Sequence, residues 1–217
     1  TTKSLGLKPR SGHPLPAMVE VKGGYLNAMG LPNPGIAEFI EELKECAIEK
    51  PLIGSIYGGN KDEFKELARR LSEYVDFIEL NLSCPHAGEL GATIGSQPRL
   101  VEEIVKAVKE NTDKPVLAKL TPNVSDIGVC GIAAQNGGAD GIAAINTLKG
   151  MAIDIEIKKP ILGNKSGGLS GDSIHPVAVK SVYDLYEKVS IPILGMGWAS
   201  FGEDLVDELG DRAADFG

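Results

Sequence analysis

The feature that most constrains the fold is a regular alternation between short apolar runs and longer segments with helical periodicity. The apolar runs predict strands near residues 52–56, 77–82, 116–120, 141–145 and 193–196, and residues 1–5 are interpreted as the end of a further strand that runs into Gly6. The intervening segments predict helices over residues 36–49, 61–72, 98–110, 124–135, 176–189 and 203–209. Short antiparallel pieces are expected at residues 19–24 and 150–160. Strands that alternate with helices indicate right-handed βαβ units and a parallel sheet, so the fold class is α/β.

The number of predicted strands bears on the type of α/β fold. A closed (β/α)₈ TIM barrel needs eight strands and usually about 250 residues, whereas this chain has 217 residues and six expected strands. We therefore expect one domain over residues 1–217, a barrel that lacks about one strand unit at each end. The alternative is an open, doubly wound sheet whose strand order cannot be read from the sequence.

Composition narrows the class of protein further. The formal net charge is −8, and no basic stripe or cationic amphipathic segment is present, so we expect neither nucleic acid nor a membrane as partner. Three widely spaced cysteines, Cys46, Cys84 and Cys130, favour a reducing, cytoplasmic location. Cys46 and Cys130 lie on helical patterns and are interpreted as packing residues. The three histidines have no metal-ligand spacing, so no metal site is expected.

Polar residues gather where the predicted strands end. The run Phe77–His86 starts as an apolar strand and ends at Asn81 and Cys84, an amide and a thiol three residues apart. Other strands end at Lys3-Ser4, at Lys119 and at Asn146-Thr147. In a barrel these ends share one face, the face that carries active sites. For any one of these residues, a snorkelling lysine, a buried cysteine or a turn-forming asparagine is an alternative interpretation.

Two glycine clusters occur late in the chain, Lys165–Gly171 and Gly195–Gly197. Glycine lets backbone N–H groups approach a phosphate closely, and the loops after the last barrel strands often form such a site. Neither cluster is a GxGxxG or Walker sequence. Together they favour the phosphate of a mononucleotide.

Seven short motifs occur in order along nearly the whole chain: Thr2-Lys3-Ser4, Asn27–Asn33, Asn81–Pro85, Lys119–Asn123, Ile145-Asn146-Thr147, Ser166–Gly171 and Gly195-Met196-Gly197. Taken together they resemble the dihydroorotate dehydrogenase family, and most closely its class 1B catalytic subunits from archaea and bacteria. Cysteine rather than serine at position 84 is similar to the soluble class 1 members.

The resemblance implies an FMN-binding (β/α)₈ barrel that oxidises (S)-dihydroorotate to orotate in pyrimidine biosynthesis. Cys84 would be the general base for the C5 proton, while the C6 hydride passes to FMN. Substrate contacts would come from Lys3, Asn27, Ala28, Met29, Gly30, Leu31, Asn81, Asn146 and Thr147. Cofactor contacts would come from Lys3, Ser4, Ser55, Asn81, Lys119, Ile145, Gly171, Gly197 and Trp198.

The resemblance also implies a homodimer or heterotetramer in which electrons leave through a separate FAD/[2Fe–2S] subunit to NAD. Two other functions stay open. His86 is familiar from dihydropyrimidine dehydrogenase, which reduces uracil or thymine. A flavin-free, phosphate-binding barrel is the third possibility.

The role implied for Cys84 can be tested by substitution. Cys84→Ser is expected to slow flavin reduction at neutral pH by orders of magnitude, because a hydroxyl is a much poorer base than a thiol with a free pKa of about 8.5. Stopped-flow reduction by dihydroorotate measures the rate, and wild-type kinetics in the variant would remove Cys84 from this role.

Overall fold

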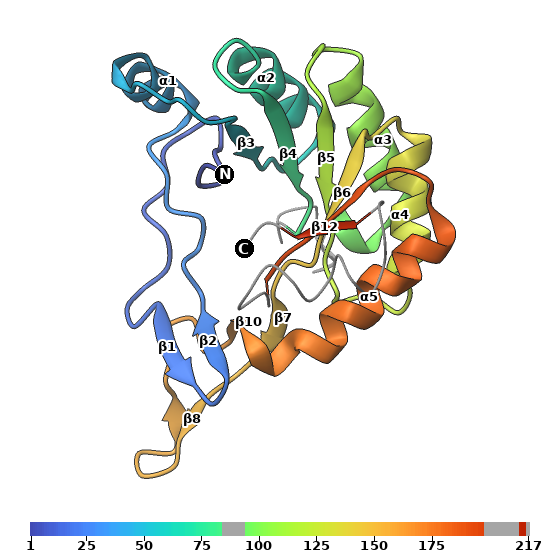
Figure 1. The fold of residues 1–217 in the computed structure, drawn as a ribbon. Coiled ribbons are helices and arrows are strands. Elements are labelled where there is room, and N and C mark those ends of the chain that lie inside the picture. The colour runs from blue at the N-terminus through green and yellow to red at the C-terminus, as the bar shows by residue number, and fades with distance from the viewer. Residues whose placement is uncertain (84–93, 198–212, 216–217) are drawn as a thin grey trace.

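The computed structural model describes residues 1–83, 94–197 and 213–215. Its elements alternate much as the periodicity predicts (Figure 1). The strands are β1 (Met18–Val21), β2 (Gly24–Asn27), β3 (Ile53–Ile56), β4 (Phe77–Asn81), β5 (Val116–Lys119), β6 (Gly141–Ala144), β7 (Leu148–Gly150), β8 (Ile153–Asp154), β9 (Lys159–Pro160), β10 (Gly167–Ser170), β11 (Ile193–Gly195) and β12 (Ala213–Asp215). The helices are α1 (Ile36–Glu45), α2 (Lys61–Leu71), α3 (Pro98–Lys109), α4 (Ile127–Asn136) and α5 (His175–Lys188), with 3₁₀ turns at Ile94–Ser96 and Asp172–Ile174.

The main sheet has six parallel strands in the order β12-β11-β6-β5-β4-β3. The strands follow one another across the sheet in the same order as along the chain. A doubly wound sheet would instead reverse its order near the middle. The sheet therefore has the sequential topology of a (β/α)₈ barrel wall.

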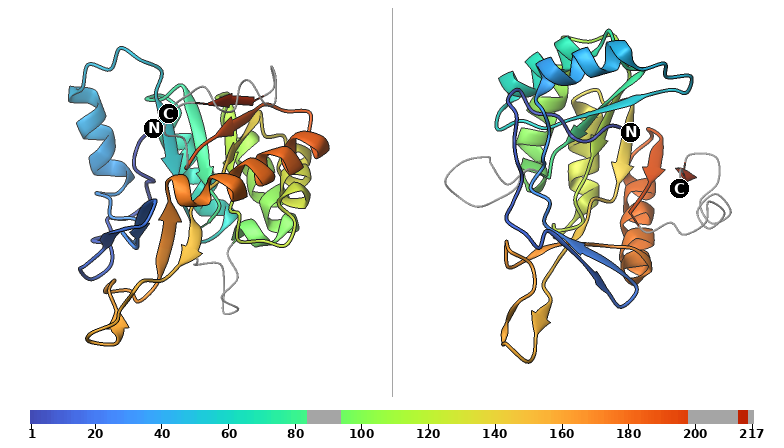
Figure 2. Two further views of the ribbon diagram at one scale, coloured as in Figure 1. Left: turned by 60° about the horizontal axis from the view of Figure 1, so that its bottom comes forward. Right: turned by 90° about the vertical axis from the view of Figure 1, so that its left-hand side faces the viewer.

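The helices cover the outer face of this sheet. α2, α3, α4 and α5 pack against one another in chain order, and Figures 1 and 2 show them along one side of the curved sheet. The main hydrophobic core lies between the two layers, with fully buried side chains such as Phe64, Leu67, Leu80 and Val105. Local signals fix the helix starts: the Asn60 side chain accepts hydrogen bonds from the N–H groups of Asp62 and Glu63, and Pro98 opens α3.

The amino-terminal segment runs beside β3 without forming a regular strand. The N–H of Thr2 donates to the Ile53 carbonyl and that of Leu5 to the Ser55 carbonyl, both at 2.9 Å. Only Leu5 forms a bridge, to Ile56, and it is parallel. The expected strand at residues 1–5 is thus reduced to a bridge, because the chain turns away at Gly6, which packs directly against the Tyr57 ring.

A second sheet stands below the carboxyl ends of the main strands in Figure 1. It is four-stranded, in the order β1-β2-β10-β7, and neighbouring strands pair antiparallel. The hairpin β8–β9 extends beyond it and corresponds to the short antiparallel piece expected at residues 150–160. The second sheet therefore faces the end of the main sheet where the polar residues were expected.

Several sequence predictions need correction. The glycine cluster Lys165–Gly171, expected to be a loop, contains strand β10, because glycines at 167 and 168 permit close packing against the Asn27 backbone and the Thr147 side chain. α1 ends at Glu45 rather than at residue 49, which leaves Cys46 exposed instead of packed. α4 begins at Ile127 rather than at residue 124, because the Asp126 side chain caps it by accepting from the Gly128 N–H.

Other expectations have mixed outcomes. Cys130 is buried in α4 as expected, and burial, followed by the nearby Asp126 carboxylate, raises the pKa of its thiol. The helix expected at residues 203–209 lies outside the described residues. Strand β12 has no counterpart in the sequence prediction. Within residues 1–83, 94–197 and 213–215, none of the helices has both the length and the apolar character to span a bilayer.

Asn33 joins the amino-terminal segment to the loop that follows β2. Its side-chain oxygen accepts from the N–H groups of Gly6 (3.2 Å) and Gly35 (2.9 Å), and its amide donates to the Leu31 carbonyl (2.9 Å) and the Tyr57 hydroxyl (3.1 Å). This buried side chain holds the loop of residues 28–32 in place.

Asn33→Ala is expected to lower the free energy of unfolding by about 2–3 kcal/mol, since it leaves buried groups without partners. Urea unfolding measures the change. Asn136→Ala is the matched control: Asn136 is exposed at the end of α4, and its replacement should change stability by less than about 0.5 kcal/mol. Equal effects of the two substitutions would contradict the role of Asn33.

Candidate functional site

A cavity of about 940 Å³ lies between the carboxyl ends of β3–β6 and the second sheet. This volume is near the upper end of the usual range for ligand pockets, about 300–1,000 Å³. Predicted site residues that line it are Lys3, Ser4, Asn27, Ala28, Met29, Gly30, Leu31, Ser55, Asn81, Lys119, Asn146 and Thr147. These residues come from the amino-terminal segment, from four parallel strands or the loops after them, and from the segment around β2.

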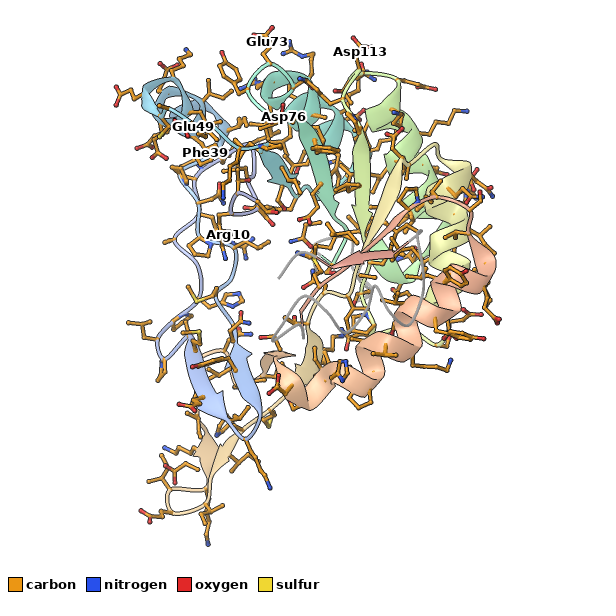
Figure 3. All side chains as sticks on the ribbon, in the orientation of Figure 1. Arg10, Phe39, Glu49, Glu73, Asp76 and Asp113 are labelled. Carbon is orange, nitrogen blue, oxygen red and sulfur yellow. The ribbon has the colours of Figure 1, made fainter. Side chains whose placement is uncertain are left out.

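The register of the parallel strands brings the polar residues together. Asn81 is the Cα partner of Lys119 across β4 and β5, and Ser55 is the partner of Glu79 across β3 and β4. Side chains alternate along a strand, so Glu79 and Asn81 point to the same face. The opposite end of the sheet is different: Figure 3 shows Glu73, Asp76 and Asp113 where β4 and β5 begin, remote from the cavity.

A hydrogen-bonded network of asparagines and serines forms one wall. The Asn81 amide donates to the Ser4 hydroxyl at 3.0 Å. The Asn146 amide donates to the Asn81 oxygen at 3.2 Å and to the Ser83 hydroxyl at 2.9 Å, and its own oxygen accepts from the Thr147 N–H. These bonds fix the orientation of the amides before any ligand arrives, which lowers the cost of ordering them on binding.

A second group of contacts holds the loops after β5 and β6. The Asn123 amide donates to the Thr121 hydroxyl and to the Thr147 carbonyl, both at 2.9 Å, and its oxygen accepts from the Lys149 N–H at 2.8 Å. On the side of the second sheet, the Asn27 amide donates to the Gly168 carbonyl at 3.4 Å. The cavity is thus bounded by loops that are tied to one another.

The charged residues that line the cavity are mainly cationic. Among the residues that the structure describes, Lys3, Lys119 and Lys149 face it together with a single carboxylate, that of Glu79. This excess of positive charge occurs in a chain whose formal net charge is −8. Among the described residues, the Lys119 ammonium donates no hydrogen bond, and its one ion pair, to Glu79, is 3.7 Å long. Its donors are therefore available to a ligand, and the site suits an anion.

Three predicted cofactor residues do not line this cavity. Ile145 is buried and its N–H donates to the Met196 carbonyl at 3.1 Å. Gly171 and Gly197 lie side by side, because the Gly171 N–H donates to the Gly197 carbonyl at 2.9 Å, and both have positive φ angles, of 102° and 98°. A Cβ at Gly197 would come within 2.9 Å of the Ile145 carbonyl oxygen. Cys84, His86 and Trp198 lie outside the described residues.

Sequence reasoning missed several residues that line the cavity, among them His13, Glu79, Ser83, Asn123 and Lys149. A signal existed for Glu79, since it is a charged residue in an apolar strand two positions before Asn81. Asn123 follows Pro122 just beyond a strand that ends in lysine. His13 and Lys149 gave no comparable signal, because their position depends on the second sheet.

Comparison with known proteins shows the family to which the chain belongs. The family model for dihydroorotate dehydrogenase matches residues 1–213. The chain belongs to the dihydroorotate dehydrogenase family. The (β/α)₈ barrel expected from the sequence is the fold of this family, and the sequential parallel sheet agrees with it.

Three similar archaeal proteins carry the description "Dihydroorotate dehydrogenase B (NAD(+)), catalytic subunit". The protein of Methanocaldococcus jannaschii is 53% identical over 212 residues, which are 95% of this chain and 69% of the relative. The protein of Pyrococcus abyssi is 53% identical over 208 residues, which are 96% of this chain and 70% of the relative. The protein of Methanosarcina mazei is 54% identical over 217 residues, which are 98% of this chain and 69% of the relative.

Asn146 offers a test of the cavity network in this dehydrogenase-family chain. Asn146→Ala removes the donors to Asn81 and Ser83 and the acceptor for the Thr147 N–H. We expect a loss of about 1–3 kcal/mol in the free energy of unfolding, measured by denaturant titration without added ligand. Asn164→Ala is the control, because Asn164 lines the same cavity but is exposed and donates only to the Ser166 carbonyl. A similar loss in both variants would show that the network has no special role.

Proposed function

We propose that this chain is the catalytic barrel of an FMN-dependent enzyme that oxidises (S)-dihydroorotate to orotate in pyrimidine biosynthesis. The observation that carries the proposal is a cavity lined by lysines and amides from successive strand ends, in a chain of the dihydroorotate dehydrogenase family. The names of the archaeal relatives support the same reaction.

The residues present fit a flavin mononucleotide and a small anionic ring. Three lysines match a phosphate and a carboxylate in charge, and the Lys119 ammonium has donors to offer. The adjoining glycines Gly171 and Gly197, at the carboxyl end of β11, suit the close approach of a phosphate. FMN, when bound, supplies the hydride acceptor, which none of the side chains can provide.

The side chains of this chain have separate tasks in the proposed reaction. Asn27, Asn81 and Asn146 would bind the substrate ring, because an amide both donates and accepts hydrogen bonds and a pyrimidine edge needs both. Cys84 would take the C5 proton of dihydroorotate on its sulfur. Lys119, with Ser4 and Ser55 nearby, would offset the negative charge that develops on the cofactor. Lys3 would lie between the cofactor and the substrate.

The electrons would leave through a second subunit. "Catalytic subunit" in the relatives' names denotes a partner, and "NAD(+)" names the acceptor of those proteins. We propose an FAD/[2Fe–2S] subunit as the partner, in a heterotetramer around a homodimer of this chain. The three cysteines of this chain do not supply the four thiolates that a [2Fe–2S] cluster of the Cys₄ type requires.

The full-length protein tests the proposal directly. It should purify with a flavin spectrum, and dihydroorotate should bleach that spectrum anaerobically. Reduction of uracil without oxidation of dihydroorotate would assign the chain to pyrimidine catabolism instead. A protein without bound flavin would favour a phosphate-binding barrel of another class.

Lys119→Ala is expected to weaken FMN binding or slow its reduction by dihydroorotate by tenfold or more, since it removes a cation from the cavity wall. FMN titration and stopped-flow reduction measure the two effects. Lys114→Ala is the matched control, because Lys114 precedes the same strand at the end remote from the cavity. If the Lys119 variant binds and reduces FMN as the Lys114 variant does, Lys119 has no such role.

A further inference from the structure

Glu79 is a buried carboxylate that the proposed reaction does not use. Its side chain is 1% exposed, although it lies in the middle of β4 among apolar residues. One oxygen, Oε1, accepts a hydrogen bond from the Ser55 hydroxyl at 2.8 Å and lies 3.7 Å from the Lys119 ammonium. The other oxygen, Oε2, is buried and has no hydrogen-bond partner within the described residues.

The groups that stabilise the Glu79 carboxylate all lie on the cavity side of β4. An ionised carboxylate is costly to bury unless cations and donors compensate it. Here the compensation comes from Ser55 and Lys119, both of which line the cavity. Lys119 is 22% exposed, so its ammonium bridges the buried carboxylate and the open cavity.

The contacts continue from Glu79 along the cavity floor. The Ser55 hydroxyl lies 2.8 Å from the Ser4 hydroxyl, which in turn accepts from the Asn81 amide. Glu79 is therefore connected through the Ser55 and Ser4 hydroxyls to the Asn81 amide, one of the amides proposed to bind the substrate. On its other side, Glu79 faces the Lys119 ammonium. No other carboxylate among the described residues lines this cavity.

We propose that Glu79 is a positioning residue that holds the Lys119 ammonium at the cavity floor and partly offsets its charge, thereby setting the reduction potential of the bound flavin. The inference rests on the proposed function. An unopposed ammonium would favour the reduced, more negative flavin strongly, whereas a paired ammonium favours it less.

The test uses the full-length protein with FMN bound. Glu79→Gln keeps the shape of the side chain and an acceptor for Ser55 but removes the negative charge. We expect the affinity for reduced FMN to rise about tenfold relative to that for oxidised FMN, which equals a shift of about 30 mV to more positive potential for a two-electron couple. Equilibration with a redox dye measures the potential, and an unchanged value would overturn the inference.

A charge-matched control separates this effect from a general change in net charge. Asp126→Asn also converts a carboxylate paired with a lysine, Lys188 at 2.7 Å, into an amide. That pair joins α4 to the end of α5 and does not line the cavity. Its removal should leave the potential unchanged, and an equal shift in both variants would overturn the inference.

A second background tests whether Glu79 acts through Lys119. In Lys119→Met the potential should become more negative, and adding Glu79→Gln should then shift it by less than half of its effect in the wild type. Equal shifts in both backgrounds would rule out positioning. If Glu79→Gln alone is strongly destabilised, the double variant should unfold at a higher temperature than the single one, because it no longer carries a Lys119 ammonium without its carboxylate partner. Failure to recover would also overturn the inference.

The outcomes distinguish this inference from the proposed function. A wild-type protein that binds no flavin, or that does not oxidise dihydroorotate, refutes the proposed function before any variant is compared. A wild-type protein that does both, with a potential that Glu79→Gln leaves unchanged, refutes only the role of Glu79.

Discussion

The register of the parallel strands is the constraint on which the site depends. It places Ser55 opposite Glu79 and Asn81 opposite Lys119. Since side chains alternate along a strand, a shift of one residue in β4 would turn Glu79 and Asn81 into the helical layer and bring Ile78 and Leu80 into the cavity. Ile78 and Leu80 are fully buried, and the cost of moving these apolar side chains into the cavity prevents that shift. The same core that stabilises the sheet therefore also positions the polar cluster.

The local sequence was sufficient to predict most of this wall. β3, β4, β5, β6 and β11 lie within one or two residues of their predicted bounds, because each is a short apolar run between clear helix and turn signals. The end of each strand was equally readable, so Lys119, Asn81 and Asn146 could be assigned to one face. That assignment needed only the rule that parallel strands share their carboxyl end.

Of the second sheet, only the local hairpin that starts at residues 19–24 was expected from the sequence; the pairings of β10 with β2 and with β7 are non-local and could not be predicted. β7 is three residues long, and β10 is a glycine-rich segment with no apolar alternation. β10 becomes a strand by pairing with β2 and β7, and β7 by pairing with β10, and these partners are distant in sequence. Intrinsic β-propensity is a weak predictor of strands that form in this way. The amino-terminal segment was wrongly predicted for another reason. It runs beside β3 as a strand would, but it forms only one bridge, at Leu5, before Gly6 packs against Tyr57.

The outer side of the cavity is formed by segments that are far apart in sequence and are therefore synthesised at different times. Asn27 and Gly168 are 141 residues apart and lie side by side where β2 pairs with β10. Closing a loop of that length costs entropy that only the finished sheet offsets. During synthesis the hairpin β1–β2 emerges early with an unpaired edge, and the pocket acquires its outer boundary only after β10 has left the ribosome. Until then, the free edge of this hairpin can pair with a strand of another chain.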